Sequence, residues 1–410
     1  MRILYLNPCG KMGGAETSLR ELLASVRAAE PDWELWLVLG EEGPLSGIAR
    51  ELGVRVIVAP FPPALARLGD ARRHPLLVFW SLLTAAIATA RYAWRLTAIH
   101  RTVQPDVIHT NGFKMHLLGI WTRPRRAAVV WHIHDYVSPR PLMGRLLSRW
   151  AHKCTAAIAN SKSVAADLRT LMPDLKVVTI YNAVDLARFA PVGATVDLDA
   201  LAGLAPAAPG TVRVGLVATF ARWKGHLVFL RALSSLSADS PVRGYVIGGP
   251  IYQTADSQFT MLELQQEQKR CGLAGRVGFT GFLNDTAEAM RSLDVVVHAS
   301  TEPEPFGMVI IEAMACAKPV IVSQAGGAAE LFQDEQTALG FAAGDVTSLA
   351  RQMARLAADG SLRVRLGQAA RAAAEQSFHG QRMAHEVVRL YHQCREDGRK
   401  AAAFLPSLNR

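Results

Sequence analysis

The sequence predicts an α/β protein with two doubly wound domains, each built on a parallel sheet. Two series of short apolar runs alternate with stretches of helix length, as expected where helices cover both faces of a parallel sheet. Between the series lies APVGATVDLDALAGLAPAAPG, a segment rich in alanine, proline and glycine that is typical of a linker. A chain of 410 residues, half of them hydrophobic, is long enough for two such domains.

The first series holds seven strand candidates and the second holds five. In order they are RILYLN, LWLVLG, VRVIVA, DVIHT, AVVWHIH, AAIAN and KVVTIYN, then VRVGLVAT, GYVIGG, RVGFTG, DVVVHAS and PVIVSQ. We expect an N-terminal domain over 1–189, the linker over 190–210, a C-terminal domain over 211–380, and within 381–410 a helix that crosses back to the first domain. Ligands of doubly wound sheets bind at the carboxyl ends of the strands, so we expect the two domains to face a central cleft there.

The net charge of +10 lies entirely in the first half of the chain. Residues 1–190 carry 24 lysines and arginines against 14 acidic residues. Such an excess suits a nucleic acid, an anionic membrane surface or a phosphorylated substrate, and a solvated arginine-rich surface is the alternative. Five scattered cysteines without a CxxC pair indicate a reducing cytoplasm, and MRILYLNPCG does not resemble a cleavable signal peptide.

An apolar stretch at residues 75–90, PLLVFWSLLTAAIATA, is short for a membrane span, which needs about 20 residues. Its basic and aromatic neighbours favour a helix at a bilayer interface over residues 72–95. These neighbours are Arg72, Arg73, Arg91, Tyr92, Trp94 and Arg95, and Trp80 lies within the stretch. The alternative is a buried helix of the first domain.

Two corners of the first domain favour an anionic or polar ligand. In NPCGKMGGAET a strand is followed by a glycine loop and a helix, so Gly13 and Gly14 let the backbone approach a ligand at a helix N-terminus. In HTNGFKMHLLG, Asn111 follows a strand and Lys114 starts a helix. We therefore place Gly13, Asn111 and Lys114 among the acceptor-binding candidates.

The segment VVWHIHDY ends a strand with His132 and His134 on one face, followed by Asp135. A metal site would need a further ligand cluster, and none is evident in the sequence. Polar groups at the carboxyl end of a strand more often contact a substrate, so these three residues are candidate substrate contacts.

The segment TFARWKGH follows the first strand of the second domain and places Arg222 and Lys224 beside Gly225. Arginine supplies bidentate contacts to phosphate and lysine supplies a point charge. No GxxxxGK[ST] sequence is present, which excludes a P-loop of the nucleotide-hydrolysing kind.

The segment EPEPFGMVIIEAMACAKPV predicts a helix from about Phe306 to Ala317. Its first amides, Gly307 through Val309, are placed to hold a diphosphate. Glu304 precedes the helix and Glu312 lies inside an apolar run, where an unpaired carboxylate is expensive. A nucleotide sugar would satisfy both, with its sugar at Glu304 and its ribose at Glu312.

The Glu304–seven residues–Glu312 pattern resembles the signature of retaining glycosyltransferases of family four, which have the GT-B fold of two Rossmann-like domains. Further motifs occur in the family's order: GGAE, HD after a strand, NSKSVAADL, YNAVDLARF, the lysine–glycine pair, VIGGP, VGFTGF and GGAAEL. The resemblance covers nearly the whole chain.

The resemblance implies a role for each matching residue. It implies that Arg222 and Lys224 bind the donor diphosphate, Glu304 the transferred sugar and Glu312 the ribose, with His134 near the reacting sugar. The remaining donor-binding residues that it implies are Gly14, Gly248, Phe282, Phe306, Gly307, Met308 and Val309. His134, Glu304, Lys224 and Arg222 are the expected catalytic residues, and no metal or cofactor is expected.

Three positions depart from the family pattern. The usual glycine–arginine pair before the lysine is Ala218–Thr219, so the arginine role falls to Arg222. The usual glycine before Lys318–Pro319 is Ala317, which affects a helix end more than the donor site. Asp197 and Asp199 form a DxD in the linker, away from the expected site.

The predicted function is transfer of a sugar, with retained configuration, from a nucleoside diphosphate to a hydroxyl of a glycan, lipid-linked or small-molecule acceptor. A UDP-sugar is slightly preferred as donor, and cell-envelope polysaccharide or glycolipid assembly is the expected setting. The expected location is the cytoplasm, with contact to the inner face of the membrane, and nucleic acid is not an expected partner. The alternatives are a catalytically silent scaffold, a GT-B epimerase or phosphorylase, and an enzyme of small metabolites.

Overall fold

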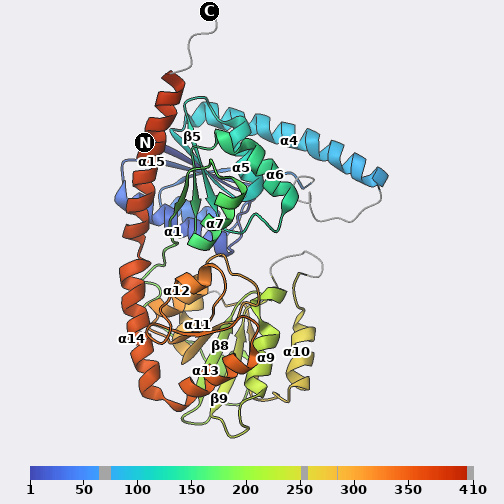
Figure 1. The fold of residues 1–410 in the computed structure, drawn as a ribbon, viewed down its shortest axis with the longest axis vertical. Helices are drawn as coiled ribbons and strands as arrows, with labels where there is room; N and C mark the ends of the chain where they lie inside the picture. Colours follow the sequence, from blue (N-terminus) through green and yellow to red (C-terminus); the bar gives the residue numbers. More distant parts are fainter. Residues whose placement is uncertain (64–74, 251–256, 284, 404–410) are drawn as a thin grey trace, which may run out of the picture. The chain divides into compact units, whose positions relative to one another are not determined.

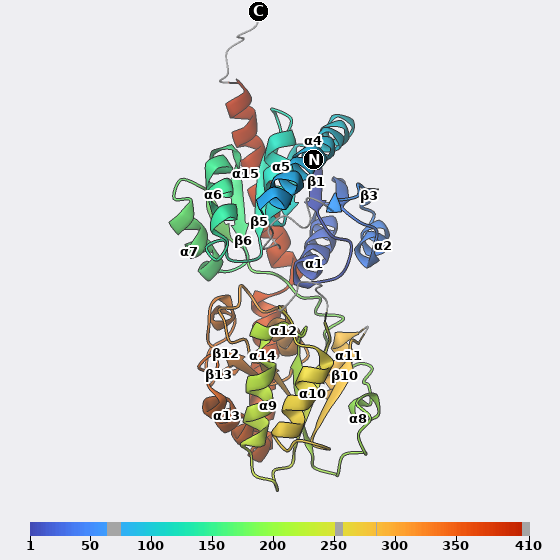
Figure 2. The same ribbon diagram turned by 90° about the vertical axis from the view of Figure 1, so that its right-hand side faces the viewer.

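The computed structural model describes residues 1–63, 75–250, 257–283 and 285–403. The chain divides into two compact units, one formed by Met1–Ala183 with the segment from Gly380 onward, the other by Val184–His379. Each unit has its own parallel sheet with helices on both faces (Figures 1 and 2). This confirms the predicted α/β class.

The first unit is built on a seven-stranded parallel sheet of order β3-β2-β1-β4-β5-β6-β7. Its strands are β1 (Arg2–Asn7), β2 (Glu34–Leu39), β3 (Arg55–Val58), β4 (Val107–Asn111), β5 (Ala128–Ile133), β6 (Ala156–Ala159) and β7 (Val177–Thr179). All seven coincide with the runs expected from the sequence. The runs are apolar throughout because alternate side chains of one strand enter different cores. In β1, Leu4 and Leu6 join one core, while Ile3 and Tyr5 join the other.

Two helical layers cover this sheet. One core takes side chains from α1 (Gly14–Ala29), α2 (Pro44–Glu51) and α15 (Gly380–Ala403). The other takes them from α4 (Pro75–Val103), α5 (Phe113–Thr122), α6 (Pro141–Trp150) and α7 (Lys162–Leu171), with a 3-10 turn η1 (Ala151–Lys153) after α6. Right-handed crossovers explain the two layers, since the chain moves outward from β1 in one direction and from β4 in the other.

The last helix, α15, packs on the first unit although it follows the second unit in the sequence. Tyr391 and Cys394 are fully buried there. The Tyr391 hydroxyl lies 2.7 Å from Nδ1 of His109 on β4. The returning helix is therefore joined to the sheet by a polar contact as well as by apolar packing.

The second unit has a six-stranded parallel sheet of order β10-β9-β8-β11-β12-β13. Its strands are β8 (Val212–Val217), β9 (Val242–Ile247), β10 (Val277–Gly281), β11 (Val295–His298), β12 (Val320–Ser323) and β13 (Leu339–Phe341). The first five were expected, and β13 was not.

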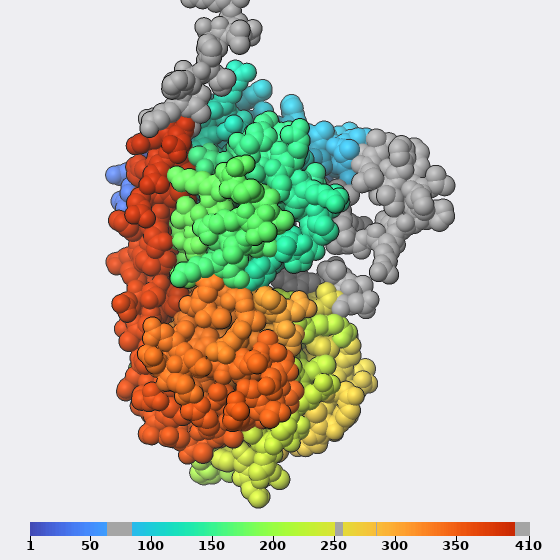
Figure 3. All heavy atoms as spheres, in the orientation of Figure 1, coloured from blue at the N-terminus to red at the C-terminus, as the bar shows by residue number. Residues whose placement is uncertain are grey.

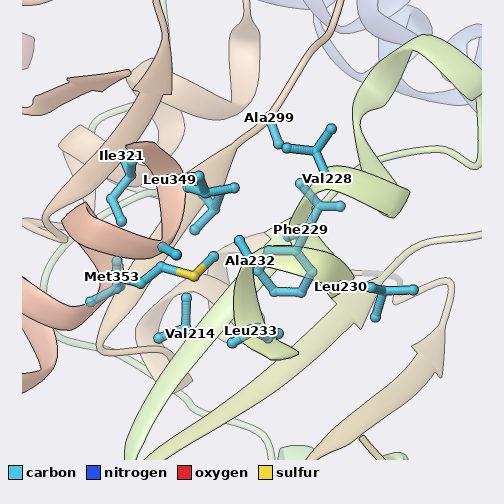
Figure 4. Close-up of a cluster of buried hydrophobic side chains, with 14 of the residues drawn as sticks. Val214, Val228, Phe229, Leu230, Ala232, Leu233, Ala299, Ile321, Leu349 and Met353 are labelled. Carbon is cyan, nitrogen blue, oxygen red and sulfur yellow. The ribbon is translucent and has the colours of Figure 1, made fainter. Parts of the chain in front are cut away.

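The helices of this unit complete its layers. They are α8 (Leu198–Leu201), α9 (His226–Ser234), α10 (Met261–Arg270), α11 (Thr286–Ser292), α12 (Met308–Ala315), α13 (Val346–Ala358) and α14 (Gly360–Ser377), with 3-10 turns η2 (Arg222–Lys224) and η3 (Gly327–Glu330). Figure 4 shows part of the core, where Phe229 of α9 lies near Val214 of β8 and Met353 of α13. This packing holds α9, and hence the loop before it, against the sheet.

Residues 190–210, expected as a linker, lie inside the second unit, whose borders fall at Ala183–Val184 and His379–Gly380. The two acidic residues of this segment have structural roles. Asp197 caps α8 through the amides of residues 199 and 200, and buried Asp199 accepts hydrogen bonds from Arg243 (2.6 Å) and Tyr245 (2.6 Å). The DxD sequence thus anchors this segment to the sheet.

The strand order reverses direction at one place in each sheet. In the first unit this place is between β1 and β4, and in the second it is between β8 and β11. Such a reversal opens a crevice at the carboxyl ends of the two strands, because their connections leave on opposite faces. The candidate site of each unit is therefore sought there.

Helix α4 contains the apolar stretch that was considered for membrane contact. Tyr92, expected at a headgroup boundary, is instead buried, whereas Trp94 is 75% exposed. The wrong expectation for Tyr92 has a simple cause, since its ring packs edge-on against Phe61 and joins the core. Arg72 and Arg73 lie outside the described residues, and so does the side chain of Trp80. Among the described helices, none combines the length and apolar character needed to cross a bilayer.

Candidate functional site

The second unit brings Lys224 and Glu304 together at its strand reversal. Lys224 ends η2 after β8, Glu304 follows β11, and the lysine Nζ donates to both carboxylate oxygens, at 2.9 and 2.7 Å. Gly225 turns the chain sharply after the lysine with φ of +79°, and a Cβ there would lie 1.8 Å from the Ala299 carbonyl oxygen. Only glycine permits this close approach of the β8 loop to the end of β11.

Two residues at the end of β11 hold the Glu304 carboxylate from its other side. Ser300 Oγ donates to Oε2 at 2.7 Å, and His298 Nε2 lies 3.2 Å from the same oxygen. Because a carboxylate only accepts, the His298 proton in this contact is on Nε2. Burial by itself raises the pKa of Glu304, but the charge of Lys224 and the contact with His298 hold that pKa well below its usual range. Glu304 is therefore ionised and fixed in direction.

The backbone of Glu304 is fixed by the segment that follows β12. Its amide donates to the Ala325 carbonyl at 3.3 Å, and its carbonyl accepts from the Gly327 amide at 2.7 Å. The GGAAEL motif thus supports the backbone of the loop that carries Glu304.

Helix α12 begins at Met308, close to the predicted start. Its N-cap, Gly307, has φ of +101°, a conformation that favours glycine. Phe306 is buried edge-on against Phe378, which anchors the loop before the helix. The amides of Met308 and Val309 have no carbonyl partner within the helix, and a helix end of this kind can bind an anion.

Glu312 lies one turn inside α12 and is half-buried. Glu312 is therefore less enclosed than its apolar run suggested, and the buried carboxylate of the site is Glu304. The cause lies in the helix itself, since Ile311 and Ala313 on either side of Glu312 face the core while Glu312 faces away. The Glu312 side chain thus keeps part of its surface exposed.

Arg222 and Lys224 differ in their surroundings although they are two residues apart. Arg222 donates to Glu263 of α10 at 2.7 Å, and its guanidinium lies 4.5 Å from the centre of the Phe259 ring. Backbone contact with Thr260 and the Arg222 hydrogen bond lower the pKa of Glu263 to about 2. The side chain of Arg222 is thus turned toward α10, whereas that of Lys224 is turned toward Glu304.

Gly248 and Phe282 lie in the loops after β9 and β10. Gly248 has φ of +136°, and a Cβ there would lie 2.1 Å from the Ala218 carbonyl oxygen. The ring of Phe282 covers Gly249 and is 55% exposed. An exposed aromatic ring over a glycine backbone at the carboxyl edge of the sheet is suited to stacking on a flat group.

In the first unit, His134 follows β5 and contacts Asn111 at the end of β4. His134 Nε2 lies 2.9 Å from Asn111 Oδ1, so Nε2 carries the proton and Nδ1 keeps the lone pair of the neutral ring. His132 lies beneath it, with ring centres 4.0 Å apart, and is almost fully buried. Of these two histidines, only His134 retains accessible surface.

A chain of polar contacts continues from His132 into the core. His132 Nδ1 lies 3.2 Å from His109 Nε2, and His109 Nδ1 lies 2.7 Å from the Tyr391 hydroxyl of α15. Burial lowers the pKa of His134 to about 4 and that of His109 to about 3. Both rings are neutral at pH 7. No group of three possible ligands that could hold a metal ion occurs in the part of the chain described.

The other first-unit candidates lie around the same strand ends. Gly112 turns between β4 and α5 with φ of +81°, and Lys114 is the second residue of α5. The Asp135 carboxylate accepts hydrogen bonds from Arg140 (2.7 Å) and from the Tyr136 amide (2.8 Å), and its ion pair with Arg140 is partly exposed.

The glycine loop after β1 ends at Gly13, the N-cap of α1, and Gly14 is its first residue. Glu16 turns back from the first turn toward Asn7, whose Nδ2 lies 3.3 Å from Glu16 Oε1. Burial raises the pKa of Glu16. A Cβ on Gly14 would meet nothing within 4 Å, so this glycine stands beside open space.

Sequence reasoning missed His298 and Ser300, as well as His109 and Tyr391. The signal for the first two was present, since they end the run DVVVHAS as His132 and His134 end VVWHIH. No local signal links His109 to Tyr391, which lies 282 residues away.

Comparison with known proteins gives two family matches. Residues 12–188 match the family described as Glycosyltransferase Family 4, and residues 207–373 match that described as Glycosyl transferases group 1. The two matches correspond to the two sheets and together span most of the chain.

Individual relatives agree with these matches. The chain is 29% identical over 301 residues to the lipopolysaccharide core biosynthesis mannosyltransferase LpcC of Rhizobium leguminosarum, covering 69% of this chain and 84% of LpcC. It is 31% identical over 229 residues to a D-inositol 3-phosphate glycosyltransferase of Salinispora arenicola, covering 52% of this chain and 49% of that enzyme. Among solved structures, HepE of Anabaena in complex with UDP superposes with a TM-score of 0.76 at 26% identity, covering 96% of this chain and all of HepE. HepE has also been solved with UDP-glucose.

Proposed function

Because this chain belongs to the retaining glycosyltransferases of family four and has their GT-B fold, we propose that it transfers a sugar from a UDP-sugar to a hydroxyl of a cell-envelope glycan or lipid-linked acceptor. The second unit would bind the nucleotide sugar and the first unit the acceptor. Attack on the face that the nucleotide leaves would retain the anomeric configuration, with the departing phosphate assisting deprotonation of the acceptor.

One observation carries the donor assignment: Lys224 and Glu304 form an ion pair at the strand reversal of the second unit. A diphosphate bound at Lys224 would replace Glu304 as the partner of the positively charged lysine. The carboxylate, still held by Ser300 and His298, then presents Oε1 to hydroxyls of the sugar. Lys224 and the first amides of α12 would stabilise the negative charge that develops on the leaving diphosphate.

The remaining donor contacts follow from the positions of the side chains. Glu312, half-buried and further along α12, would accept hydrogen bonds from the ribose hydroxyls. Phe282 would stack on the base and Gly248 would let the backbone approach it. Arg222 would leave Glu263 to contact the diphosphate, since its ion pair with Glu263 is exposed and such pairs are weak.

On the acceptor side, His134 would contact the reacting sugar with Nδ1 or its ring edge, because Nε2 is engaged with Asn111. Gly13, Asn111, Lys114 and Asp135 would surround the acceptor, and Gly14 would cover the donor phosphates. His132 supports His134 from below and is too buried for direct contact.

Two findings support an envelope acceptor. LpcC acts in lipopolysaccharide core biosynthesis by its name, and the excess positive charge of this chain lies in the half that would hold the acceptor. Residues 72–95 would bring that half to the inner face of an anionic membrane. The D-inositol 3-phosphate relative favours instead a small phosphorylated acceptor, which the same basic surface would attract.

A thermal-shift series tests the donor proposal. UDP-, GDP-, ADP- and TDP-sugars are compared with the free sugars, since a ligand that binds only the folded state raises the melting temperature by mass action. We expect UDP-sugars to give the largest rise. If none of the nucleotide sugars shifts the transition, the proposed donor site is wrong. A stabilised chain that forms no product with any envelope or small-molecule acceptor would favour the catalytically silent scaffold.

A further inference from the structure

Helix α6 carries an unusual outward face. Leu142 is 72% exposed and Leu146 is 37% exposed, one turn apart, and Arg145 and Arg149 alternate with them. The opposite side of the helix is anchored, since Leu147 is fully buried. Figure 3 shows α6, in teal-green, in the outer layer of the first unit. The helix therefore presents two leucines and two arginines to its surroundings on a rigid support.

The two arginines have no protein partner among the described residues, although other arginines nearby do. Arg140, just before the helix, pairs with Asp135 at 2.7 Å. Arg145 and Arg149 make no ion pair or hydrogen bond with their side chains in the described structure. Their positive charge is thus uncompensated beside two exposed leucines.

A pocket of about 500 Å³ runs along the same helix. Its walls combine the apolar side chains of Val137, Pro141 and Leu171 with Ser148, Arg145 and Arg149. An apolar hollow with two cations at its side fits an amphiphile with an anionic head.

The wider surroundings have the same charge. Residues 75–176, which include the α7 residue Leu171 at the pocket, contain fourteen lysines and arginines and four acidic residues. Asp106 and Asp135 have arginine partners, Arg395 and Arg140, and Asp167 accepts hydrogen bonds from the backbone amides of Val137 and Ser138. The net charge of this segment favours an anionic partner, and the exposed leucines favour an apolar phase.

We propose that α6 docks on the headgroup layer of an anionic phospholipid bilayer, with Leu142 and Leu146 entering the acyl boundary and Arg145 and Arg149 binding lipid phosphates. A helix with leucines between arginines meets the two layers of a bilayer interface at once. A soluble polyanion would satisfy the arginines and leave the leucines in water. A neutral apolar protein surface would bury the leucines and leave the arginines without an anionic partner.

The position of α6 also links this surface to the candidate acceptor site. The chain passes from His134 to Pro141 in one short loop, and Arg140 in that loop lies 5.3 Å from the centre of the Phe113 ring, the first residue of α5. Docking through α6 would place a lipid-linked acceptor within reach of His134. This part of the inference rests on the proposed function, whereas binding of α6 to the bilayer does not.

Vesicle flotation of the full chain tests the docking. The vesicles contain phosphatidylglycerol in phosphatidylcholine, or phosphatidylcholine alone, at low and at physiological salt. We expect binding to the anionic vesicles only. Arg145→Ala with Arg149→Ala should lower the apparent affinity about 25-fold, or about fivefold for each arginine, corresponding to ~1 kcal/mol per basic residue near an anionic surface. Leu142→Glu should lower the apparent affinity at least about tenfold, since it replaces a leucine that would be buried in the acyl boundary of the bilayer.

The matched control is Leu262→Glu on α10 of the second unit, where the leucine is 63% exposed. This variant should float like the wild type. Titration with UDP-glucose by calorimetry should give the same affinity for all these variants, which separates failure of docking from failure of the donor site. The inference is overturned if the wild type does not bind anionic vesicles at low salt. It is also overturned if Leu142→Glu binds the anionic vesicles as tightly as the wild type and dextran sulfate displaces both proteins from them. Charge alone would then explain the binding, and the partner would be a soluble polyanion.

Discussion

Lys224 Nζ donates to both oxygens of the Glu304 carboxylate, at 2.9 and 2.7 Å, so two groups with different tasks in the proposed reaction neutralise each other in the unliganded chain. The pair is mostly enclosed, with 21% of the lysine side chain and 8% of the glutamate side chain exposed. The charge of Lys224 helps to hold the pKa of Glu304 well below its usual range although the carboxylate is buried. In the proposed reaction a diphosphate replaces Glu304 as the partner of Lys224, and the carboxylate keeps its contacts with Ser300 and His298.

Replacing Lys224 should affect turnover more than donor binding. The lysine charge matters most when negative charge builds up on the departing diphosphate, and loss of such a group typically lowers the rate about 100-fold or more. We expect kcat of Lys224→Ala to fall by about that factor, measured by release of UDP, with a smaller change in donor affinity.

Lys224→Arg serves as the control, because it keeps the charge but changes the shape of the donor group. It should recover part of the lost rate. A Lys224→Ala variant with wild-type kcat would exclude Lys224 from the catalytic residues.

Glu312→Ala should weaken nucleotide-sugar binding without disturbing the fold. The half-buried carboxylate is proposed to accept hydrogen bonds from ribose, and loss of a charged hydrogen bond is worth about 1.5–3 kcal/mol of affinity. Calorimetry with the UDP-sugar measures the change, and the melting temperature without ligand checks the fold. Glu288→Ala on α11 is a matched helical control. Equal donor affinity in Glu312→Ala and the wild type would contradict the ribose assignment.

The contribution of Glu304 to stability should disappear in acid. Its folded-state pKa lies below the ordinary glutamate value, so the stabilisation is fully present above that ordinary value of about 4.3 and is lost as the pH falls toward the folded-state pKa. Urea unfolding of the wild type and Glu304→Gln, between pH 7 and pH 3, measures the difference in free energy of unfolding. We expect this difference to shrink as the pH falls. A difference that stays constant over the range would show that the carboxylate charge does not stabilise this unit.

The twelve strands that the sequence indicated are present, because buried parallel strands are apolar on both faces and stand out as short runs. The thirteenth, β13, has only three residues, and its centre is Gly340. A Cβ there would lie 2.2 Å from the exposed side chain of Gln324, which would have to move to make room. Such a strand is defined by its neighbour β12 and leaves no pattern of its own in the sequence.

The domain borders and the residues that support the site were harder to predict, because both depend on contacts between distant parts of the chain. The composition of 190–210 is that of a linker, and the contacts of one residue, Asp199, with Arg243 and Tyr245 are enough to fix the segment to the second sheet. Lys224, Glu304 and Glu312 could be chosen from motif spacing. The Tyr391–His109 contact joins two residues far apart in the sequence, and such contacts follow only from the fold.

Ala317→Gly should stabilise the second unit. Ala317 follows α12 with φ of +55°, a left-handed conformation that costs an L-residue about 1–2 kcal/mol. Glycine removes this strain but loses about 0.5–1 kcal/mol through the larger entropy of its unfolded chain. We expect a net gain of up to about 1 kcal/mol, seen as a higher midpoint in urea. Ala313→Gly, inside the helix, should instead destabilise by about 1 kcal/mol. A loss of stability in Ala317→Gly would show that the left-handed backbone conformation of Ala317 is not strained.

The last prediction concerns α4, the second element proposed to contact the membrane. Trp94 is 75% exposed beside Arg91, whereas Tyr92 between them is buried and Arg95 donates to the Val58 carbonyl at 3.1 Å. Of these four side chains, Trp94 and Arg91 can therefore be replaced without disturbing the core. In the flotation assay, Trp94→Ala with Arg91→Ala should weaken binding to anionic vesicles about tenfold, through loss of an aromatic contact at the headgroups and of one charge. A double variant that floats like the wild type, together with loss of binding in the α6 variants, would remove α4 from the docking surface and leave α6 as the docking helix.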